Sequence, residues 1–305
     1  MKGLILVTGS EGLVGSRFVE ISERKNFLHL PKQVELDITN PSEIKAVLSS
    51  YNFSAVVHFA AFTDLNAAEE ERGNNDGACW QVNVEGTRNL VEAVRPYKAK
   101  VHFVHISTDG VFSGNSDDPG PYKEDHPRET DPTRVTWYGF TKGEAEKAVQ
   151  EVLGDSATIL RIIYPVRTEF EGKLDFLRKP LKLYDEGKLY PMFTDQQISV
   201  SFIDEVCKAL DKIIIDGHKG IFHACSDTTT PHKLISYMLE KTRGVTNAVE
   251  GTTLREFLEK TGNPSYRYPK FGGLKVGVTE AKLGIKFSTW REIVDKLVTQ
   301  GLGEK

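Results

Sequence analysis

The chain has 305 residues, of which 39% are hydrophobic and 27% charged, and its formal net charge at pH 7 is −4. This composition predicts a globular protein with a sizeable core, in one large domain or two unequal ones, and the negative charge argues against a nucleic-acid binder. The apolar run at the start is four residues long, too short for a signal peptide or a membrane span, so we expect a cytoplasmic protein without a membrane partner.

The first predicted element is a strand over residues 4–7, which leads into a turn with three spaced glycines and then into a helix. Gly9 permits the tight turn, Gly12 lets the backbone approach a pyrophosphate, and Gly15 lets the helix pack on the strand. The N–H groups at the start of the helix would face the phosphates. The pattern predicts a dinucleotide-binding Rossmann-type α/β fold with a doubly wound parallel sheet. The cofactor-binding residues expected here are Thr8, Gly9, Glu11, Gly12, Leu13, Val14 and Gly15.

A second strand is expected over residues 27–30, followed by a proline and Lys32. A fold that prefers NAD usually has an acidic residue at the end of this strand to hold the ribose hydroxyls. Lys32 can instead pair with a 2′-phosphate, or it can be an ordinary surface lysine. The predicted cofactor is therefore NADP, with NAD as the alternative.

Residues 34–39 are expected to form a third short strand, with a helix after the Asn-Pro pair that follows it. Asp37 in that strand would line the adenine end of the cofactor or be the acid that holds the ribose. The unbroken apolar run 55–59 predicts a buried parallel strand that ends in small residues, where it should open onto the cofactor. A helix is predicted over about 79–94, with Asn83 facing either the sheet or solvent.

The next strand is predicted over residues 101–106, and it delivers Ser107, Thr108 and Asp109 at its carboxyl end. In an open parallel sheet, chemistry takes place at that end of the strands. A loop rich in proline and acidic residues follows over 113–132. It is too polar for a core and long enough to be a substrate-side flap.

A helix is predicted from residue 137, and Tyr138 and Lys142 lie four residues apart on one face of it. A phenol with a pKa near ~10 exchanges protons poorly at neutral pH, but an ammonium beside it stabilises the phenolate and lowers that pKa. Thr108 can hydrogen-bond the carbonyl oxygen that the tyrosine protonates. With the glycine pattern upstream, these residues predict the catalytic site of a carbonyl reductase.

From residue 168 to 191 the pattern turns helical and is expected to begin a smaller substrate-side lobe. Residues 193–204 are expected to form a strand that rejoins the main sheet and then starts a helix, and residues 221–225 another strand. His223 and Cys225 alternate on the latter strand, but two ligands make no site, so no metal is expected. The predicted domains are a cofactor domain over 1–163, to which 195–225 returns, and a substrate-binding lobe over 164–194 and 226–305.

The glycine pattern, Ser-Thr-Asp at a strand end and Tyr-x-x-x-Lys further on together resemble the extended short-chain dehydrogenases/reductases. Several longer sequence segments resemble the dTDP-4-dehydrorhamnose reductase (RmlD-like) group, and they are spread over nearly the whole chain. The segments that carry this resemblance are 60–64, 82–87, 107–114, 137–142 and 160–161 and, more weakly, 274–276, 283–285 and 290–292.

The resemblance implies that Tyr138 is the general acid, which protonates a ketone oxygen while NAD(P)H gives a hydride to its carbon. It implies that Lys142 binds the nicotinamide ribose and lowers the pKa of the tyrosine, and that Thr108 polarises the carbonyl. Asp37 and Ile38 would flank the adenine. The further cofactor contacts expected are Lys32, Phe59, Ala60, Ala61, Tyr138 and Lys142.

A substrate diphosphate would suit arginine, because a guanidinium matches phosphate geometry in a bidentate way. Arg167, Arg178 and Arg267 are the candidates, although a single arginine is more often a surface or structural residue. The predicted substrate-binding residues are Thr63, Asp109, Tyr164 and Arg167.

The sequence departs from the group at Gly110, where rhamnose reductases usually have an aromatic residue and the 4,6-dehydratases a glutamate. Gly110 therefore counts against a dehydratase and removes one sugar contact. The stretch 161–167 also departs from the usual wording, which leaves the sugar and the nucleotide base open.

The resemblance implies an NAD(P)H-dependent reductase of a nucleotide-activated 4-keto-6-deoxy sugar, as in dTDP-rhamnose biosynthesis. One alternative is a sugar-nucleotide epimerase that retains NAD. Another is a non-catalytic NADP-binding subunit like that of methionine adenosyltransferase, although intact Thr108, Tyr138 and Lys142 favour catalysis. Members of the group often pair through helices of the cofactor domain, so a homodimer is a further expectation.

Overall fold

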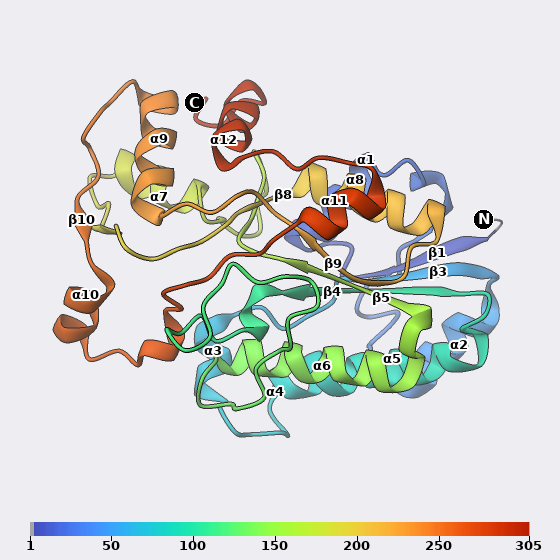
Figure 1. Ribbon diagram of the computed structural model, residues 1–305. Coiled ribbons are helices and arrows are strands. Elements are labelled where there is room, and N and C mark those ends of the chain that lie inside the picture. The colour runs from blue at the N-terminus through green and yellow to red at the C-terminus, as the bar shows by residue number, and fades with distance from the viewer. Residues whose placement is uncertain (1–2, 305) are drawn as a thin grey trace. The chain divides into compact units, whose positions relative to one another are not determined.

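The structure, a computed structural model, describes residues 3–304 of the chain (Figure 1). The chain divides into two compact units, each built from three separate stretches of sequence. The first unit comprises Met1–Phe112, Pro127–Arg161 and Cys207–Phe222, and the second comprises Ser113–His126, Ile162–Val206 and His223–Lys305.

A six-stranded sheet with the order β2-β1-β3-β4-β5-β9 forms the centre of the first unit. The pairs β1–β2, β1–β3 and β3–β4 are parallel. Since β2 lies on one side of β1 and β3 on the other, the crossovers change direction at β1, and sheets of this kind bind ligands outside the carboxyl ends of the strands at that point. The strands are β1 Leu4–Thr8, β2 Leu28–His29, β3 Phe53–His58, β4 His102–Thr108, β5 Ala157–Ile162 and β9 Gly220–Ala224.

Helices cover both faces of this sheet, with α2, α5 and α6 on one side and α1 and α8 on the other (Figure 1). Ile44 of α2, Leu90 of α5 and Val149 of α6 are fully buried in one cluster with Phe103 of β4. The helices are α1 Leu13–Ile21, α2 Pro41–Ser50, α3 Leu65–Glu70, α4 Ala78–Trp80, α5 Thr87–Val94, α6 Trp137–Leu153 and α8 Ile203–Asp216. A π-helical turn spans Gln81–Gly86, and 3₁₀ turns span Lys25–Phe27, Arg95–Tyr97, Asp109–Val111 and Gly154–Ser156. The predicted Rossmann-type α/β class is confirmed.

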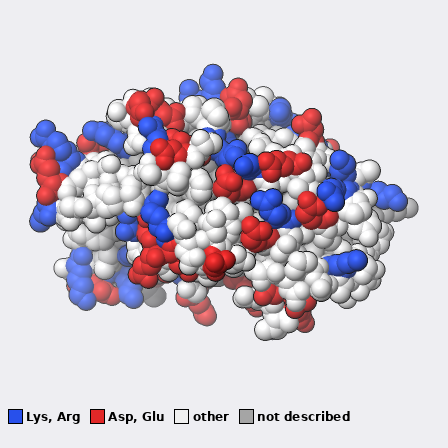
Figure 2. All heavy atoms as spheres, turned by 90° about the horizontal axis from the view of Figure 1, so that it is seen from below, with Lys and Arg blue, Asp and Glu red and all other residues white. Residues whose placement is uncertain are grey.

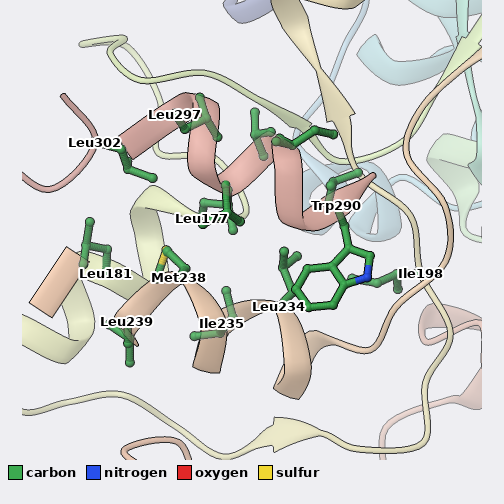
Figure 3. Close-up of a cluster of buried hydrophobic side chains, with 14 of the residues drawn as sticks. Leu177, Leu181, Ile198, Leu234, Ile235, Met238, Leu239, Trp290, Leu297 and Leu302 are labelled. Carbon is green, nitrogen blue, oxygen red and sulfur yellow. The ribbon is translucent and has the colours of Figure 1, made fainter. Parts of the chain in front are cut away.

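The second unit has its own hydrophobic core, in which Trp290 of α12 packs with Leu234 and Met238 of α9 (Figure 3). Two short parallel strand pairs accompany it, β6 with β8 and β7 with β10. Its elements are β6 Pro165–Val166, α7 Arg178–Asp185, β7 Met192–Phe193, β8 Ser201–Phe202, α9 Pro231–Arg243, β10 Gly251–Thr252, α10 Leu254–Thr261, a 3₁₀ turn Ser265–Arg267, α11 Gly277–Leu283 and α12 Trp290–Thr299.

The prediction of a strand over residues 34–39 is wrong, because this segment satisfies its backbone groups locally. The Lys32 carbonyl accepts from the N–H groups of Glu35 and Leu36, each at 2.9 Å. The Asp37 carboxylate accepts from the N–H and the hydroxyl of Thr39, each at 2.8 Å. The alternation of apolar residues reflects burial of Leu36 and of Ile38 within a series of turns.

Three expectations for the other loops also need correction. The segment 193–204 does not rejoin the main sheet, since β7 pairs with β10 and β8 with β6. In the stretch 168–191 only Arg178–Asp185 is helical. The loop 113–132 is not too polar for a core: Tyr122 and Glu124 are buried in the second unit, where Glu124 accepts hydrogen bonds from the N–H and hydroxyl of Thr279.

Acidic and basic side chains are interspersed over the face shown in Figure 2, in keeping with the small net charge. Among residues 3–304, no helix combines the length and the apolar character that a membrane crossing requires.

Candidate active site

The glycine-rich turn connects β1 to α1 at the carboxyl edge of the sheet. Gly9 has φ +69°, and a Cβ there would lie 2.5 Å from the Ala60 nitrogen, so the turn packs directly on the segment after β3. A Cβ at Gly15 would stand 2.3 Å from the Gly9 carbonyl oxygen. Gly12 is the N-cap residue of α1 and has no side chain to accept from the first helical N–H groups. This surface therefore fits a pyrophosphate at a helix start.

The residues expected near the adenine lie around β2 and the turns after it. Lys32 is exposed, while Asp37 uses one carboxylate oxygen to accept from Thr39. Ile38 is buried, and its side chain packs so closely on Gly86 that a Cβ there would meet it at 2.7 Å. The contribution of Lys32, Asp37 and Ile38 to cofactor binding stays a prediction.

Asn83 faces the interior, which decides between the two orientations that the sequence left open. Its Oδ1 accepts from the Phe62 N–H at 2.8 Å, and its Nδ2 donates to the Phe62 carbonyl at 3.2 Å and to the Thr141 hydroxyl at 3.0 Å. Asn83 therefore ties the segment after β3, which includes the predicted contacts Phe59, Ala60, Ala61 and Thr63, to the helix that bears Tyr138. Its place within a π-helical turn is what the sequence pattern did not reveal.

Two glycines bring the end of β4 against the start of α6. A Cβ at Gly139 would stand 2.0 Å from the Gly110 carbonyl oxygen, so no other residue fits there without displacement. The contact places Thr108 and Tyr138, which flank this pair of glycines in the sequence, at the same edge of the sheet. The Thr108 hydroxyl oxygen accepts from the Gly110 N–H at 3.1 Å.

Ser107 and Thr108 are neighbours, but their hydroxyls have different partners. Ser107 donates to the Glu146 carboxylate in the interior, and Arg161 of β5 donates to the same carboxylate at 2.9 and 2.7 Å. Arg161 and Glu146 are 2% and 1% exposed, so this is a fully buried ion pair. Ser107 is thus a structural residue, and the catalytic role of Thr108 stays a prediction. Glu146 is not recognisable as a site residue from the sequence alone, although it lies one helical turn after Lys142 on the face of α6 that carries Tyr138.

Lys142 is 3% exposed and lies against β4. Its Nζ donates to the Ile106 carbonyl at 2.8 Å and lies 3.2 Å from Nε2 of His105. Burial lowers the pKa of Lys142 to about 8, while the Glu146 carboxylate acts in the opposite direction. The ammonium is therefore held in place by the strand before any ligand contributes.

The groups around Tyr138 raise the pKa of its phenol, whereas the expectation was that Lys142 lowers it. Burial raises the pKa of Tyr138, and the Asp109 carboxylate and the Cys79 thiol raise it further. Burial also raises the pKa of Asp109 to about 7. The phenol accordingly stays protonated at neutral pH, which suits a proton donor.

The remaining substrate candidates belong to the second unit. Tyr164 has φ +39°, and its ring lies against that of Phe176, with the centroids 4.3 Å apart and the ring planes tilted by 30°. The Arg167 guanidinium lies over the Phe170 ring at 5.6 Å. Arg178 donates to Asp175 and to two backbone carbonyls, which gives its guanidinium a structural use. Binding of substrate by Tyr164 or Arg167 stays a prediction.

Comparison with known proteins agrees with this geometry. The chain matches the family described as the RmlD substrate binding domain over residues 1–302. A dTDP-4-dehydrorhamnose reductase of Streptomyces griseus is 36% identical over 225 residues, 72% of this chain and 69% of that protein. A probable dTDP-4,6-dihydroxy-2-methyloxan-3-one 4-ketoreductase of Streptomyces antibioticus is 31% identical over 268 residues, 86% of this chain and 84% of that protein.

The fold is shared with a solved dTDP-4-dehydrorhamnose reductase of Bacillus anthracis in complex with NADP. The two superpose with a TM-score of 0.81 at 21% identity, over 98% of this chain and 100% of the other. The resemblance predicted from the glycine pattern, Ser-Thr-Asp and Tyr-x-x-x-Lys is thereby confirmed, and the chain belongs to the RmlD substrate binding domain family.

Proposed function

We propose that this protein is an NAD(P)H-dependent reductase of a nucleotide-activated 4-keto-6-deoxy sugar. The observation that carries the proposal is the convergence of Thr108, Tyr138 and Lys142 on the edge of the sheet where the glycine-rich turn also lies. Relatives named as dTDP-4-dehydrorhamnose reductase and as a dTDP-linked 4-ketoreductase support the substrate class. The residues that we propose to act in catalysis are Thr108, Tyr138 and Lys142.

Each of these residues has a defined part in reducing a ketone. The nicotinamide cofactor, when bound, supplies the hydride. The Tyr138 hydroxyl gives its proton to the ketone oxygen, and the Thr108 hydroxyl hydrogen-bonds that oxygen and orients it. The Lys142 ammonium holds the nicotinamide ribose, and its charge stabilises the phenolate left after proton transfer. Because burial raises the pKa of Tyr138, this stabilisation is needed for the tyrosine to act near neutral pH.

The cofactor expected is NADP, with NAD as the alternative. The glycine-rich turn and the uncapped start of α1 fit the pyrophosphate that both cofactors share. Lys32 is exposed. With its side chain beside the adenosine, its charge would pair with the 2′-phosphate and favour NADP. Solved structures of the same fold are in complex with NADP or with NAD, so they support a nicotinamide cofactor, and the preference for NADP depends on Lys32.

The residues proposed to bind the substrate are Thr63, Asp109, Tyr164 and Arg167. We further infer a cytoplasmic location, in keeping with three cysteines that are buried and widely spaced in the sequence. A homodimer remains a prediction that sedimentation equilibrium would test.

Fluorescence titration with NADPH and with NADH, each with and without a dTDP-4-keto-6-deoxy sugar, tests the proposal. Oxidation of the reduced cofactor only when the sugar is present supports a reductase. Conversion of the sugar without net oxidation would indicate an epimerase that retains its cofactor. Tight cofactor binding without conversion of any keto sugar would indicate a regulatory subunit.

A further inference from the structure

A row of polar side chains crosses the sheet beneath the candidate site. Thr8 of β1 is in register with His58 of β3, and His58 with His105 of β4. The two histidine rings are 5.3 Å apart, and all three side chains are at most 3% exposed. Lys142 of α6 completes the row through its contact with His105 at 3.2 Å. The row therefore connects the start of the glycine-rich turn to the catalytic lysine.

The hydrogen bonds determine which nitrogen of His58 carries the proton. The Thr87 hydroxyl donates to the Asn83 carbonyl at 2.7 Å, so it can only accept from Nε2 of His58, at 3.0 Å. Nδ1 of His58 then accepts from the Thr8 hydroxyl at 2.7 Å. Burial and the charge of Lys142 lower the pKa of His58 to about 3, so its ring is neutral. Both ring nitrogens of His58 are thus hydrogen-bonded, to Thr8 and to Thr87.

His105 has a different arrangement. An ammonium has three donors and no acceptor, so Nε2 of His105 must accept from Nζ of Lys142 while that group is charged. The ring proton then lies on Nδ1, which is buried and has no hydrogen-bond partner among residues 3–304. An unpaired buried N–H is costly, so the stability of the protein alone gives no reason for histidine at this place. The contact with Lys142 gives a reason for a histidine at residue 105.

We propose that His105 is a positioning residue for Lys142, whose ammonium it holds through Nε2 at the place from which Lys142 acts on Tyr138 and the nicotinamide ribose. This inference rests on the proposed function. Two acceptors on adjacent residues, the Ile106 carbonyl and the His105 ring, direct two of the three N–H bonds of Lys142 into the strand. The third remains to serve the cofactor.

The other groups around Lys142 give the sign of the expected effect. Burial lowers the pKa of Lys142, while Glu146 of α6 and Cys79 of α4 raise it. His58 of β3 and His105 of β4 are neutral, because burial and the charge of Lys142 lower the pKa of each. An acceptor stabilises the charged form of an amine, so removing the His105 acceptor lowers the pKa of Lys142 further. Activity that needs the ammonium is then lost at a lower pH.

The test compares His105→Leu, which removes the acceptor, with His105→Gln, whose amide oxygen can replace it. The matched control is His102→Leu, because His102 lies on the same strand, is 4% exposed, and also has a buried Nδ1 for which the described part of the chain offers no partner. His102 bonds Thr158 instead of Lys142. If His105→Leu does not fold, His105→Phe retains a ring without an acceptor and serves the same purpose.

The first measurement is a pH titration of Lys142 Nζ by NMR in protein carrying ¹⁵N-labelled lysine, without cofactor, with the resonance assigned by its loss in Lys142→Met. We expect His105→Leu to raise the acid dissociation constant of Lys142 by about 10- to 100-fold, the value of a hydrogen bond to a charged group. His105→Gln should restore most of the change, and His102→Leu should leave the constant unaltered. An unaltered constant in His105→Leu, or an equal change in His102→Leu, would overturn the proposal.

The second measurement is the pH profile of kcat in the same variants. The alkaline limb should move to lower pH in His105→Leu by the amount that the titration gives, and stay in place in His102→Leu. Absence of turnover by the unmodified protein would count against the proposed function alone, because the titration needs neither cofactor nor substrate. A limb that stays in place in His105→Leu while its Lys142 titrates lower would overturn the link between His105 and catalysis.

Discussion

The carbonyl oxygen of Gly110 lies so close to Gly139 that a Cβ at residue 139 would stand 2.0 Å from it. This contact joins the end of β4 to the first turn of α6, and thus Thr108 to Tyr138. A Cβ at Gly110 would meet nothing closer than 3.4 Å, where it would touch the Thr108 side chain. Gly139 therefore has no room for a side chain, whereas Gly110 can be replaced by alanine without a close contact.

Gly139→Ala should push α6 away from β4 and separate Tyr138 from Thr108. Although alanine favours a helix by about 1 kcal/mol over glycine, overpacking against a backbone carbonyl costs about 1–3 kcal/mol, so we expect a net loss of stability and at least about a tenfold loss of kcat. Gly110→Ala is the matched control and should retain most of both. Thermal unfolding and steady-state kinetics of the pair check this, and equal activities of the two variants would contradict it.

Tyr138→Phe should abolish turnover while leaving cofactor affinity nearly unchanged, because the ring remains and only the proton donor is lost. A positioned general acid contributes about 10²- to 10⁴-fold to the rate, and the loss should be of that size. Fluorescence titration with NADPH and a turnover assay on the same preparation measure the two effects. Reduction of the same ketone at near the original rate would remove Tyr138 from the mechanism.

Glu146→Gln should be strongly destabilising, because it removes the carboxylate charge that is paired with the buried Arg161 guanidinium. Breaking a buried ion pair from one side costs about 3–5 kcal/mol. Glu144→Gln, on the same helix, is the control: Glu144 lies 3.8 Å from Arg128 and is 20% exposed, so its loss should cost less than about 1 kcal/mol. Urea denaturation compares them, and similar midpoints would show that the buried pair carries little stability.

Asp109→Asn should change how stability depends on pH. Burial raises the pKa of Asp109 to about 7, so the folded state favours the protonated carboxyl. This contribution is fully present below the unfolded pKa of about 4 and is lost as pH rises towards 7. Relative to its parent, the asparagine variant should therefore gain about 4 kcal/mol between pH 4 and pH 8, because the shift of about three pKa units is worth about 1.4 kcal/mol per unit. A stability difference that is constant over this range would contradict the assignment.

Lys32→Ala should weaken binding of NADPH by about tenfold, the value of one charge-assisted contact with a phosphate, and should leave NADH nearly unaffected. Lys98→Ala, at another exposed lysine of the first unit, is the control. Parallel fluorescence titrations with the two cofactors measure the ratio. Equal effects on NADPH and NADH would place Lys32 outside the cofactor site.

The sequence revealed those parts of the site that depend on local order. Gly9, Gly12 and Gly15 are spaced by a turn, and Tyr138 and Lys142 by one turn of a helix, so their relation is visible in the chain itself. The strand 55–59 was recognisable because its apolar run is unbroken, as is typical of a parallel strand buried on both faces. These elements fixed the fold class and the position of the predicted catalytic residues.

What the sequence did not reveal depends on contacts between distant segments. Glu146 and Arg161 are on a helix and a strand, and neither alone signals a pair. His105 reads as one residue of an apolar strand until Lys142 is placed beside it. Residues 34–39 alternate like a strand, yet the Asp37 side chain holds them in turns, a competition between local and ladder hydrogen bonds that periodicity does not resolve.

The most direct test of the central claim follows the hydride itself. NADPH deuterated on the transferring face of the nicotinamide is incubated with the protein and a dTDP-4-keto-6-deoxy sugar, and the product is examined by mass spectrometry and NMR. We expect one deuterium on carbon 4 of the sugar for each NADPH oxidised, and about 10²- to 10⁴-fold slower labelling with Tyr138→Phe. Unlabelled sugar with the cofactor unconsumed would contradict the assignment as a reductase.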